Sequence, residues 1–280
     1  MTVLITGSNG QLGTELKKLL AEQNIEYIAA DANSMDITDE AKVNSFVKEV
    51  RPSIIYHCAA YTAVDKAEDE GKELNQLINV DGTRYVAKAA EENDAVIVYI
   101  STDYVFDGNK NDEYKVEDIP NPQNEYGRAK YEGELEVQKY ASKYYIIRTS
   151  WVYGEFGANF VFTMQNLAKT HSELTVVNDQ FGRPTWTRTL AEFMVYITSE
   201  KAQYGIYHFS NDNSCTWYDF AKEILKNGNI IIKPVDSSAF PQKALRPKHS
   251  IMDLSKTKAL GYKILTWEDA LNNMLESIHN

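Results

Sequence analysis

A tyrosine and a lysine lie four positions apart, at Tyr126 and Lys130, in a segment whose pattern predicts a helix. Residues at this spacing present their side chains on one helix face, so the ammonium group is expected to lie beside the phenol. A neighbouring cation favours phenolate and lowers the tyrosine pKa from about 10 toward neutral pH. The pair therefore predicts a group that can deliver or remove a proton.

The same spacing occurs a second time, at Tyr218 and Lys222, so spacing alone does not identify a site. With 18 tyrosines in the chain, about one such pair is expected by chance. Position separates the two pairs, because Tyr126 follows Thr102 after a single loop, whereas Tyr218 lies among bulky aromatic residues of a predicted core. Thr102 ends a predicted strand, where its hydroxyl could hydrogen-bond a substrate carbonyl or simply cap the strand end.

Three glycines near the start of the chain, Gly7, Gly10 and Gly13, follow a short apolar run over residues 3–5. Leucines at helical spacing come next, so this segment predicts a strand, a tight turn and a helix. Backbone N–H groups and the positive end of a helix converge at such a turn, and the missing Cβ atoms let a pyrophosphate approach closely. The alternative is an ordinary turn whose glycines only satisfy a positive φ.

Asp31 ends a second short strand, residues 27–30, about 20 residues beyond the glycine turn. A carboxylate there accepts hydrogen bonds from the adenosine ribose, which favours NAD, whereas the 2′-phosphate of NADP favours an arginine. No arginine or lysine lies between Lys18 and Lys42, so these residues weigh against strict NADP use. Asp36, in the following loop, either contacts the adenine side or caps a turn.

The elements that must position these residues alternate between strands and helices. Buried strands are predicted over residues 3–5, 27–30, 54–57, 95–100 and 144–148, with helical patterns between them. This alternation predicts an α/β fold with a doubly wound parallel (Rossmann) sheet, in which ligands bind at the carboxyl ends of the strands. Two polar residues are expected to be structural. His57, within its strand, is expected as a core histidine in preference to a catalytic one, and Asn79 as a buried amide bonded to backbone, with a tie between two strands beneath the active site as the alternative.

The chain is expected to divide into two parts. Residues 1–150 form the predicted dinucleotide-binding Rossmann domain, and the pattern becomes less regular from about Trp151. Residues 151–280 are predicted to form mainly a second, smaller α/β substrate-binding lobe. The prediction allows some of its elements to return to the main sheet.

The composition, 43% hydrophobic and 25% charged, is typical of a globular protein. A net charge of −11 argues against nucleic-acid and anionic-membrane partners, so an anionic ligand needs a local basic set. Arg183 and Arg246 are the candidates for a diphosphate, unless they only form surface salt bridges. Cys58 and Cys215 lie far apart without ligand spacing, which predicts reduced thiols in a cytoplasmic protein. No window approaches 18 apolar residues, so neither secretion nor membrane anchoring is expected.

The glycine turn followed in order by Thr102, Tyr126 and Lys130 resembles the extended short-chain dehydrogenase/reductases, which act largely on nucleotide sugars. Further segments resemble the members of that family that reduce a dTDP-linked 4-keto sugar, at residues 59–68, 101–106, 148–153, 177–185 and 246–247. The similarity runs from residue 1 to about residue 255, nearly the whole chain. It implies an oxidoreductase with a dTDP-sugar substrate.

The resemblance also implies that NADPH or NADH binds across the carboxyl edge of the sheet. The residues implied to contact its pyrophosphate, adenosine and flanks are Gly7, Gly10, Gln11, Leu12, Gly13, Asp31, Asp36, Ile37, Ala60, Tyr61 and Thr62. Lys130 is implied to hold the nicotinamide ribose, with Tyr126 beside it.

For the substrate, the resemblance implies hydride transfer to C4 of the keto sugar. Tyr126 is implied to protonate the developing alkoxide, and Thr102 to steady the same oxygen. The residues implied to contact the sugar are Asp103, Tyr104 and Trp151.

Some members of the family dimerise through Mg²⁺ held by acidic side chains, and Glu15 matches one such ligand. Arg188 lies where a second ligand is expected, which makes a metal-bridged dimer doubtful and leaves Glu15 as a solvated helix residue. A homodimer as such stays open.

Two other functions share parts of this pattern. Nucleotide-sugar epimerases and 4,6-dehydratases have the same turn and Tyr/Lys pair, but dehydratases usually carry Asp-Glu after the strand-end threonine, where this chain has Asp103 and Tyr104. Both classes retain their nicotinamide, whereas a reductase exchanges it at every turnover. The chain also resembles a cofactor-binding regulatory subunit of methionine adenosyltransferase. The intact Thr102, Tyr126 and Lys130 argue against that non-catalytic role.

Overall fold

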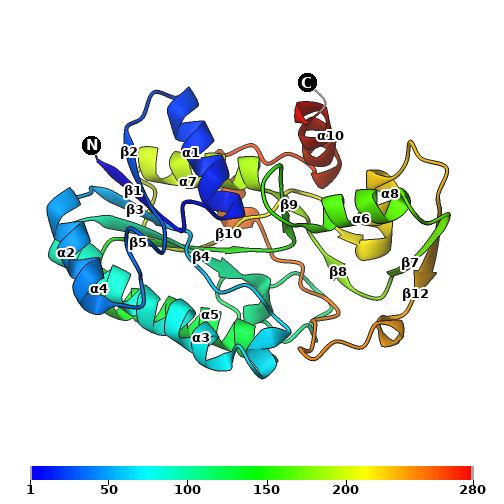
Figure 1. Ribbon diagram of the computed structural model, residues 1–280, viewed down its shortest axis with the longest axis horizontal. Helices are drawn as coiled ribbons and strands as arrows, with labels where there is room; N and C mark the ends of the chain where they lie inside the picture. Colours follow the sequence, from blue (N-terminus) through cyan, green and yellow to red (C-terminus); the bar gives the residue numbers. More distant parts are fainter. Residues whose placement is uncertain (1, 279–280) are drawn as a thin grey trace.

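A six-stranded parallel sheet, in the order β10-β5-β4-β3-β1-β2, forms the centre of the computed structural model, which describes residues 2–278 (Figure 1). Its strands are β1 (Val3–Thr6), β2 (Tyr27–Ala30), β3 (Ile54–His57), β4 (Val96–Thr102), β5 (Tyr144–Thr149) and β10 (Gly205–His208). The chain runs outward from β1 to β2 and then returns to β3 on the other side of β1. The prediction of a doubly wound parallel sheet is confirmed.

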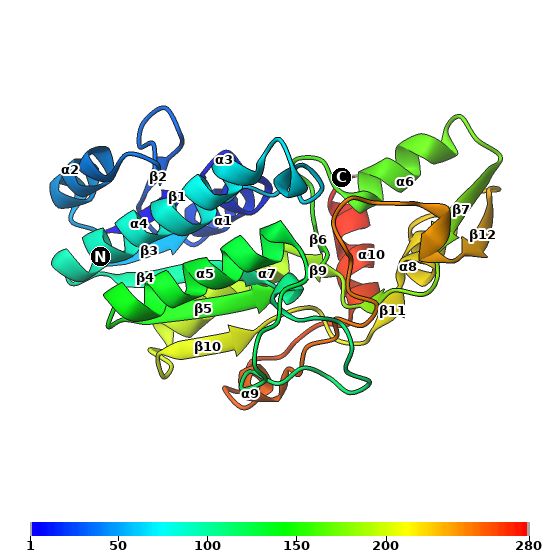
Figure 2. The ribbon, with the colours of Figure 1, turned by 90° about the horizontal axis from the view of Figure 1, so that it is seen from below.

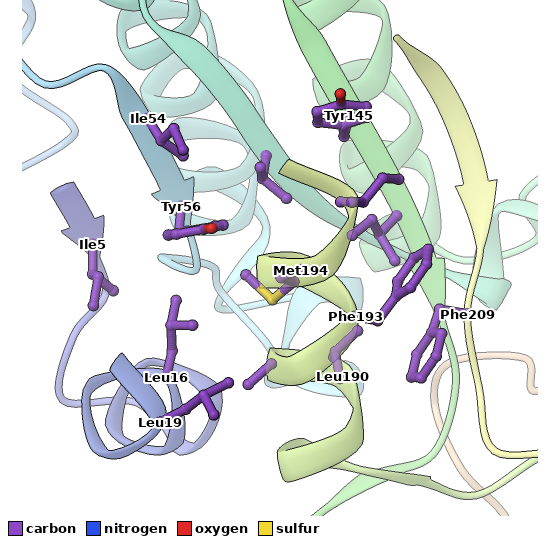
Figure 3. Close-up of a cluster of buried hydrophobic side chains, with 14 of the residues drawn as sticks. Ile5, Leu16, Leu19, Ile54, Tyr56, Tyr145, Leu190, Phe193, Met194 and Phe209 are labelled. Atoms are coloured by element: carbon purple, nitrogen blue, oxygen red, sulfur yellow. The ribbon is translucent and has the colours of Figure 1, made fainter. Parts of the chain in front are cut away.

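Both faces of the sheet are covered by helices, which is why its strands are continuously apolar. One face carries α1 (Gln11–Glu22) and α7 (Thr187–Ser199), and the other carries α2 (Glu40–Val50), α4 (Thr83–Glu92) and α5 (Glu125–Tyr140) (Figure 1). Because side chains alternate along a strand, Ile5 packs with α1 and α7, whereas Leu4 packs with α2 and α4. Figure 3 shows the first of these clusters, with Leu16 and Leu190 facing the strands.

Two elements from the second half of the chain complete the main sheet. β10 pairs in parallel with β5, placing Gly205 beside Tyr145 and His208 beside Arg148. α7 packs along α1 over the same face of the sheet. The Rossmann sheet is therefore finished by residues that follow position 150.

A second lobe lies beyond the carboxyl ends of the strands (Figure 2). It has three strand pairs, β6 (Val152–Tyr153) with β9 (Thr185–Trp186), β7 (Glu173–Val177) with β12 (Ile231–Val235), and β8 (Phe181–Gly182) with β11 (Cys215–Thr216). Its helices are α6 (Phe160–Ala168), α8 (Trp217–Ile224) and α10 (Trp267–Ser277). They enclose a separate core that includes Tyr153, Phe220 and Leu271.

Short elements connect these parts. They are η1 (Lys66–Glu68), α3 (Lys72–Gln76), the π-helical turn η2 (Leu77–Gly82), η3 (Asp103–Val105), η4 (Ser237–Ala239) and α9 (Ser255–Lys258). None of the helices within residues 2–278 combines the length and apolarity that crossing a bilayer requires.

Candidate active site

The turn after β1 depends on its glycines for close backbone packing. Gly7 has a φ of +62°, and a Cβ there would lie 2.5 Å from the backbone nitrogen of Ala59. A Cβ on Gly13 would overlap the Gly7 carbonyl oxygen and lie 2.8 Å from the Cα of Ser8. The turn is closed by a hydrogen bond from Gly10 N–H to the Gly7 carbonyl, 3.0 Å long, and α1 begins directly after it. These glycines let the turn pack tightly where a helix N-terminus meets the sheet edge, which is where a pyrophosphate site is expected.

We expect Gly13→Ala to lower the free energy of unfolding by about 1–3 kcal/mol, because the added methyl group overpacks the turn. The affinity for a nicotinamide dinucleotide should fall as well, because the turn must open to relieve the overlap. Urea denaturation and a dinucleotide titration measure the two effects. Gly228→Ala is the control, since a Cβ there would meet its nearest neighbour at 3.4 Å. Equal stability of the two variants would contradict the prediction.

The structure places Asp31 beside the glycine turn. Its carboxylate accepts a hydrogen bond from Asn9 Nδ2, 2.8 Å, and hydrogen bonds from Ser34 hold its pKa below the usual range. Lys17 reaches the same place through Asn9, with Nζ 3.3 Å from Asn9 Oδ1. Sequence reasoning missed Lys17, because it considered only cations between positions 18 and 42. A cation thus stands close to the residue expected to contact the ribose.

The loops beyond β2 and β3 bring the other predicted cofactor contacts to this edge. Asp36 accepts hydrogen bonds from the Thr38 backbone N–H and hydroxyl, 3.0 and 2.7 Å, and these lower its pKa. The expectation that Asp36 caps a turn is confirmed, and its contact with adenine stays a prediction. Ile37 packs against Gly82 in η2.

Asn79 fixes the loop after β3. It is fully buried and bonds the backbone of Tyr61 twice, accepting from its N–H at 3.1 Å and donating to its carbonyl at 2.9 Å. The expectation of a buried amide bonded to backbone is confirmed. Ala60 and Thr62 flank the residue that it holds, so Asn79 sets the position of all three.

His57 is a core residue, as expected from its place within β3. Its Nδ1 lies 2.7 Å from Thr6 Oγ1, its Nε2 lies 3.2 Å from Thr83 Oγ1, and its ring stacks on Tyr99. Burial lowers the pKa of His57 to about 3. The imidazole is therefore neutral and structural.

We expect acid to destabilise the protein partly through His57. Between pH 6.5 and about 3 the unfolded chain binds a proton there that the folded chain does not, so the free energy of unfolding falls by about 1.4 kcal/mol per pH unit. His57→Asn should remove that part of the slope in urea denaturation series from pH 7 to pH 5, while His208, whose pKa burial also lowers to about 3, keeps its own part. The exposed His171→Asn is the control. A His57→Asn slope equal to that of the wild type would refute this assignment.

The predicted catalytic residues converge at the carboxyl end of β4. Thr102 is the last residue of β4, and α5 begins at Glu125 after capping by Asn124, whose side chain accepts a hydrogen bond from Gly127 N–H at 2.7 Å. Tyr126 lies in the first turn of α5, which brings its hydroxyl beside that of Thr102, close enough to affect the pKa of the phenol. Lys130 follows one turn later and is 2% exposed.

The prediction that Lys130 lowers the pKa of Tyr126 is wrong. Burial and the nearby Asp103 carboxylate raise the pKa of Tyr126 above its usual value. The Lys130 Nζ lies 4.1 Å from the centroid of the Tyr99 ring, and burial lowers the pKa of Lys130 to about 7 although Glu134 opposes this change. Desolvation thus dominates, and Lys130 is not among the groups that shift the pKa of Tyr126. The phenol is protonated at neutral pH, which is the form that can donate a proton.

An ion pair that sequence reasoning missed anchors α5 to the sheet. Arg148 of β5 donates to both carboxylate oxygens of Glu134, from Nε at 2.9 Å and from Nη2 at 2.7 Å. Both side chains are almost fully buried. Glu134 lies one turn after Lys130, and this spacing alone could have indicated that Glu134 lies on the same buried face of α5. The pair fixes the helix that carries two of the catalytic candidates.

The two arginines predicted to bind a diphosphate differ in their surroundings. Arg246 Nη2 lies 2.7 Å from Asp65 Oδ2, its guanidinium lies over the Tyr104 ring, and its buried Nη1 has no hydrogen-bond partner among residues 2–278. Arg183 instead donates to the carbonyl oxygens of Asn213 and Met252 and to the Glu113 carboxylate. Arg246 thus keeps a donor for an anion, whereas Arg183 is held by protein acceptors and its diphosphate contact stays a prediction.

Arg246 and Tyr104 border the region where the sugar contacts are predicted. A hollow of about 280 Å³ lies beside Arg246, with Phe240, Leu245 and Gln180 in its wall. Asp103 is 2% exposed. The predicted sugar contact of Asp103 and Tyr104 stays a prediction.

Trp151 adopts a strained conformation that its neighbours maintain. Its φ is +48°, which is unusual for a bulky residue. Its indole stacks on Trp217 with ring centroids 3.6 Å apart, and a Cβ on Gly182 would lie 2.5 Å from it. Such strain persists where packing enforces it and is common at ligand sites. The predicted sugar contact of Trp151 stays a prediction.

Glu15 is not a solvated helix residue, and that expectation is wrong. It is fully buried, which raises its pKa, and Arg188 Nη1 lies 3.3 Å from its Oε1. Arg188 also pairs with Glu22 at 2.6 Å and with Glu192 at 2.8 Å. The guanidinium of Arg188 therefore lies between three carboxylates. Within residues 2–278, no three His, Cys, Asp or Glu side chains are arranged so that they could hold a metal ion.

Comparisons with known proteins agree with this geometry. The family model described as the RmlD substrate binding domain matches residues 1–280. The dTDP-4-dehydrorhamnose reductase of Aggregatibacter actinomycetemcomitans is 40% identical over 288 residues, covering 97% of each chain. A crystal structure of the dTDP-4-dehydrorhamnose reductase from Bacillus anthracis in complex with NADP has a TM-score of 0.95, 42% identity and 99% coverage of both chains. A crystal structure of a dTDP-4-dehydrorhamnose reductase from Clostridium acetobutylicum has a TM-score of 0.97, 42% identity and full coverage of both chains.

Proposed function

Because the chain belongs to the family of the RmlD substrate binding domain, we propose that it is a dTDP-4-dehydrorhamnose reductase. It uses NADPH or NADH to reduce C4 of dTDP-4-dehydro-L-rhamnose, and the product is dTDP-L-rhamnose, a precursor of cell-surface polysaccharide. The observation that carries this function is the convergence of Thr102, Tyr126 and Lys130 at the end of β4. The protein is an NAD(P)-dependent oxidoreductase of a nucleotide sugar.

The residues at the sheet edge fit a nicotinamide dinucleotide. The tight turn at Gly7, Gly10 and Gly13, with the N-terminus of α1 after it, suits a pyrophosphate, and the ionised Asp31 suits ribose hydroxyls. Lys130 would hold the nicotinamide ribose. When bound, the cofactor supplies the hydride. The solved relative from Bacillus anthracis carries NADP, which supports the same assignment here.

Tyr126 supplies the proton of the reaction. As the substrate carbonyl is reduced, negative charge develops on its oxygen, and the Tyr126 hydroxyl donates its proton to that atom. The raised pKa of Tyr126 keeps the proton in place until then. Thr102 holds the same substrate oxygen by a hydrogen bond.

We propose that the substrate binds between the two parts of the chain. Residues 1–150 are proposed to bind the dinucleotide and residues 151–280 mainly the nucleotide sugar. The sugar lies toward Asp103, Tyr104 and Trp151. The free Nη1 of Arg246 is the first donor for the diphosphate, with Arg183 as a second candidate. We further propose that the enzyme acts in the cytoplasm.

An absorbance assay at the nicotinamide band, run against a panel of 4-keto nucleotide sugars, tests this function. We expect stoichiometric oxidation of NADPH or NADH with dTDP-4-dehydro-L-rhamnose. Conversion of a nucleotide sugar without net cofactor oxidation would instead indicate an epimerase or dehydratase. Cofactor binding with no conversion of any sugar would indicate a regulatory subunit.

A further inference from the structure

The hydroxyl of Thr102 has a single proton, and a neighbouring carboxylate already accepts it. Its Oγ1 donates to Asp103 Oδ1 at 3.1 Å and accepts from Tyr104 N–H at 3.2 Å, and the Tyr126 hydroxyl lies beside it. A hydroxyl carries one proton and two acceptor lone pairs. While Asp103 is ionised it can only accept, so it takes the one proton that Thr102 has to give. Thr102 then has no proton for a substrate oxygen.

We propose that Asp103 controls the direction of the Thr102 hydrogen bond, and that the neutral carboxyl of Asp103 is the productive form. This inference rests on the proposed reductase function. A protonated carboxyl gains an O–H donor, which can donate to Thr102 Oγ1 and free the Thr102 proton for the substrate oxygen.

The same change redirects Tyr126. With Tyr104 N–H and the Asp103 carboxyl both donating to Thr102, its two lone pairs are filled. The Tyr126 hydroxyl, although it lies beside Thr102, then cannot donate to it and must find another acceptor. Both donors thus turn toward the oxygen at C4, where charge develops. Only the Tyr126 proton is transferred, and Asp103 and Thr102 keep theirs, so Asp103 is a positioning residue.

The surroundings of Asp103 allow the neutral form near physiological pH. Burial raises the pKa of Asp103 to about 6, although hydrogen bonds from Ser250 and Thr102 oppose the rise. The ionisable groups around it are Tyr126 on α5 and Tyr104 on η3, with Arg246 over the Tyr104 ring and Asp65 paired to Arg246. Among residues 2–278, no cation is one of the groups that shift the pKa of Asp103.

The first test is the pH profile of kcat/KM for dTDP-4-dehydro-L-rhamnose from pH 5 to pH 8. NADH is used as the reductant because it lacks a 2′-phosphate that titrates in this range. If only neutral Asp103 is productive, its contribution falls about tenfold per pH unit above pH 6. Lys130, whose pKa lies at about 7, also titrates here, so the readout is the difference between the wild type and Asp103→Asn.

In Asp103→Asn the amide N–H can donate to Thr102 at every pH. We expect the ratio of kcat/KM at pH 6 to that at pH 8 to be up to about 50-fold smaller in this variant than in the wild type. Thr102→Val, which has no hydroxyl to direct, should lose most turnover and show the same shallow profile as Asp103→Asn. A profile of Asp103→Asn that superimposes on the wild type after scaling would overturn the proposal.

The second test does not require turnover. In infrared difference spectra of the protein alone, a carboxylic acid C=O band should appear with a midpoint near pH 6 and be missing in Asp103→Asn. In Thr102→Val the midpoint should move to higher pH, because the lost hydrogen bond stabilises the carboxylate. An unchanged midpoint would overturn the coupling of the two residues. A wild type that consumes no cofactor would instead remove the proposed function, and the infrared result would still decide the state of Asp103.

Discussion

Replacing Tyr126 by phenylalanine is expected to reduce turnover by about 10²–10⁴-fold, the usual contribution of a positioned general acid. The variant removes one oxygen and keeps the ring, which packs edge-on against Tyr104 with centroids 6.1 Å apart. The fold and the affinity for the dinucleotide should therefore change little. Steady-state kinetics and a cofactor titration followed by fluorescence separate the loss of proton donation from a loss of binding.

The second tyrosine–lysine pair provides a matched control. Tyr218 has Lys222 Nζ 4.6 Å from its ring centroid, so it repeats the spacing and the cation contact outside the site. Tyr218→Phe should retain turnover. If Tyr126→Phe retained it as well, the proton would have to come from another group.

Arg148→Leu is expected to lower the free energy of unfolding by about 3–5 kcal/mol, because it leaves the Glu134 carboxylate buried without its partner. The pair is 2% and 0% exposed, so water cannot replace the guanidinium. Arg148 also lies over the Phe106 ring, 5.1 Å from its centroid, and that packing is lost with it. Urea denaturation measures the change.

A partly buried pair on the same helix is the control. Arg128 lies 2.5 Å from Glu125, but 49% of the Arg128 side chain is exposed and Lys72 also lies 3.4 Å from the Glu125 carboxylate, so Arg128→Leu should cost less than about 1 kcal/mol. Adding Glu134→Leu to Arg148→Leu should recover much of the loss, since no charge then remains buried. Similar losses from Arg148→Leu and Arg128→Leu would show that burial does not govern the strength of the pair.

The fold of the first half was predictable because its signals are local. Each strand of the sheet up to β5 is a short apolar run, and the glycines after β1 mark a tight turn wherever they occur. The convergence of Thr102 with Tyr126 was predictable for a related reason, because strand ends in a parallel sheet share one edge.

What could not be predicted depends on neighbours that are distant in the chain. The pKa of Tyr126 follows from burial, which spacing along α5 does not reveal. Arg183 and Arg246 look alike in the sequence, yet one donates to protein carbonyls and the other keeps a free buried nitrogen. Glu15 has the pattern of an exposed helix residue, and its burial follows from the packing of α7 along α1, which also brings Arg188 to it.

The place of β10 beside β5 has a consequence for the newly made chain. A ribosome releases residues in order, so the sheet lacks its sixth strand and its α7 cover until about residue 208 has emerged. Until then β5 is an outer strand with unpaired amides, and Leu16 and Leu19 on α1 lack the neighbours that α7 supplies. In a fragment that stops at residue 150, the edge of β5 would stay unpaired. We expect this fragment to aggregate instead of folding as an independent nucleotide-binding module.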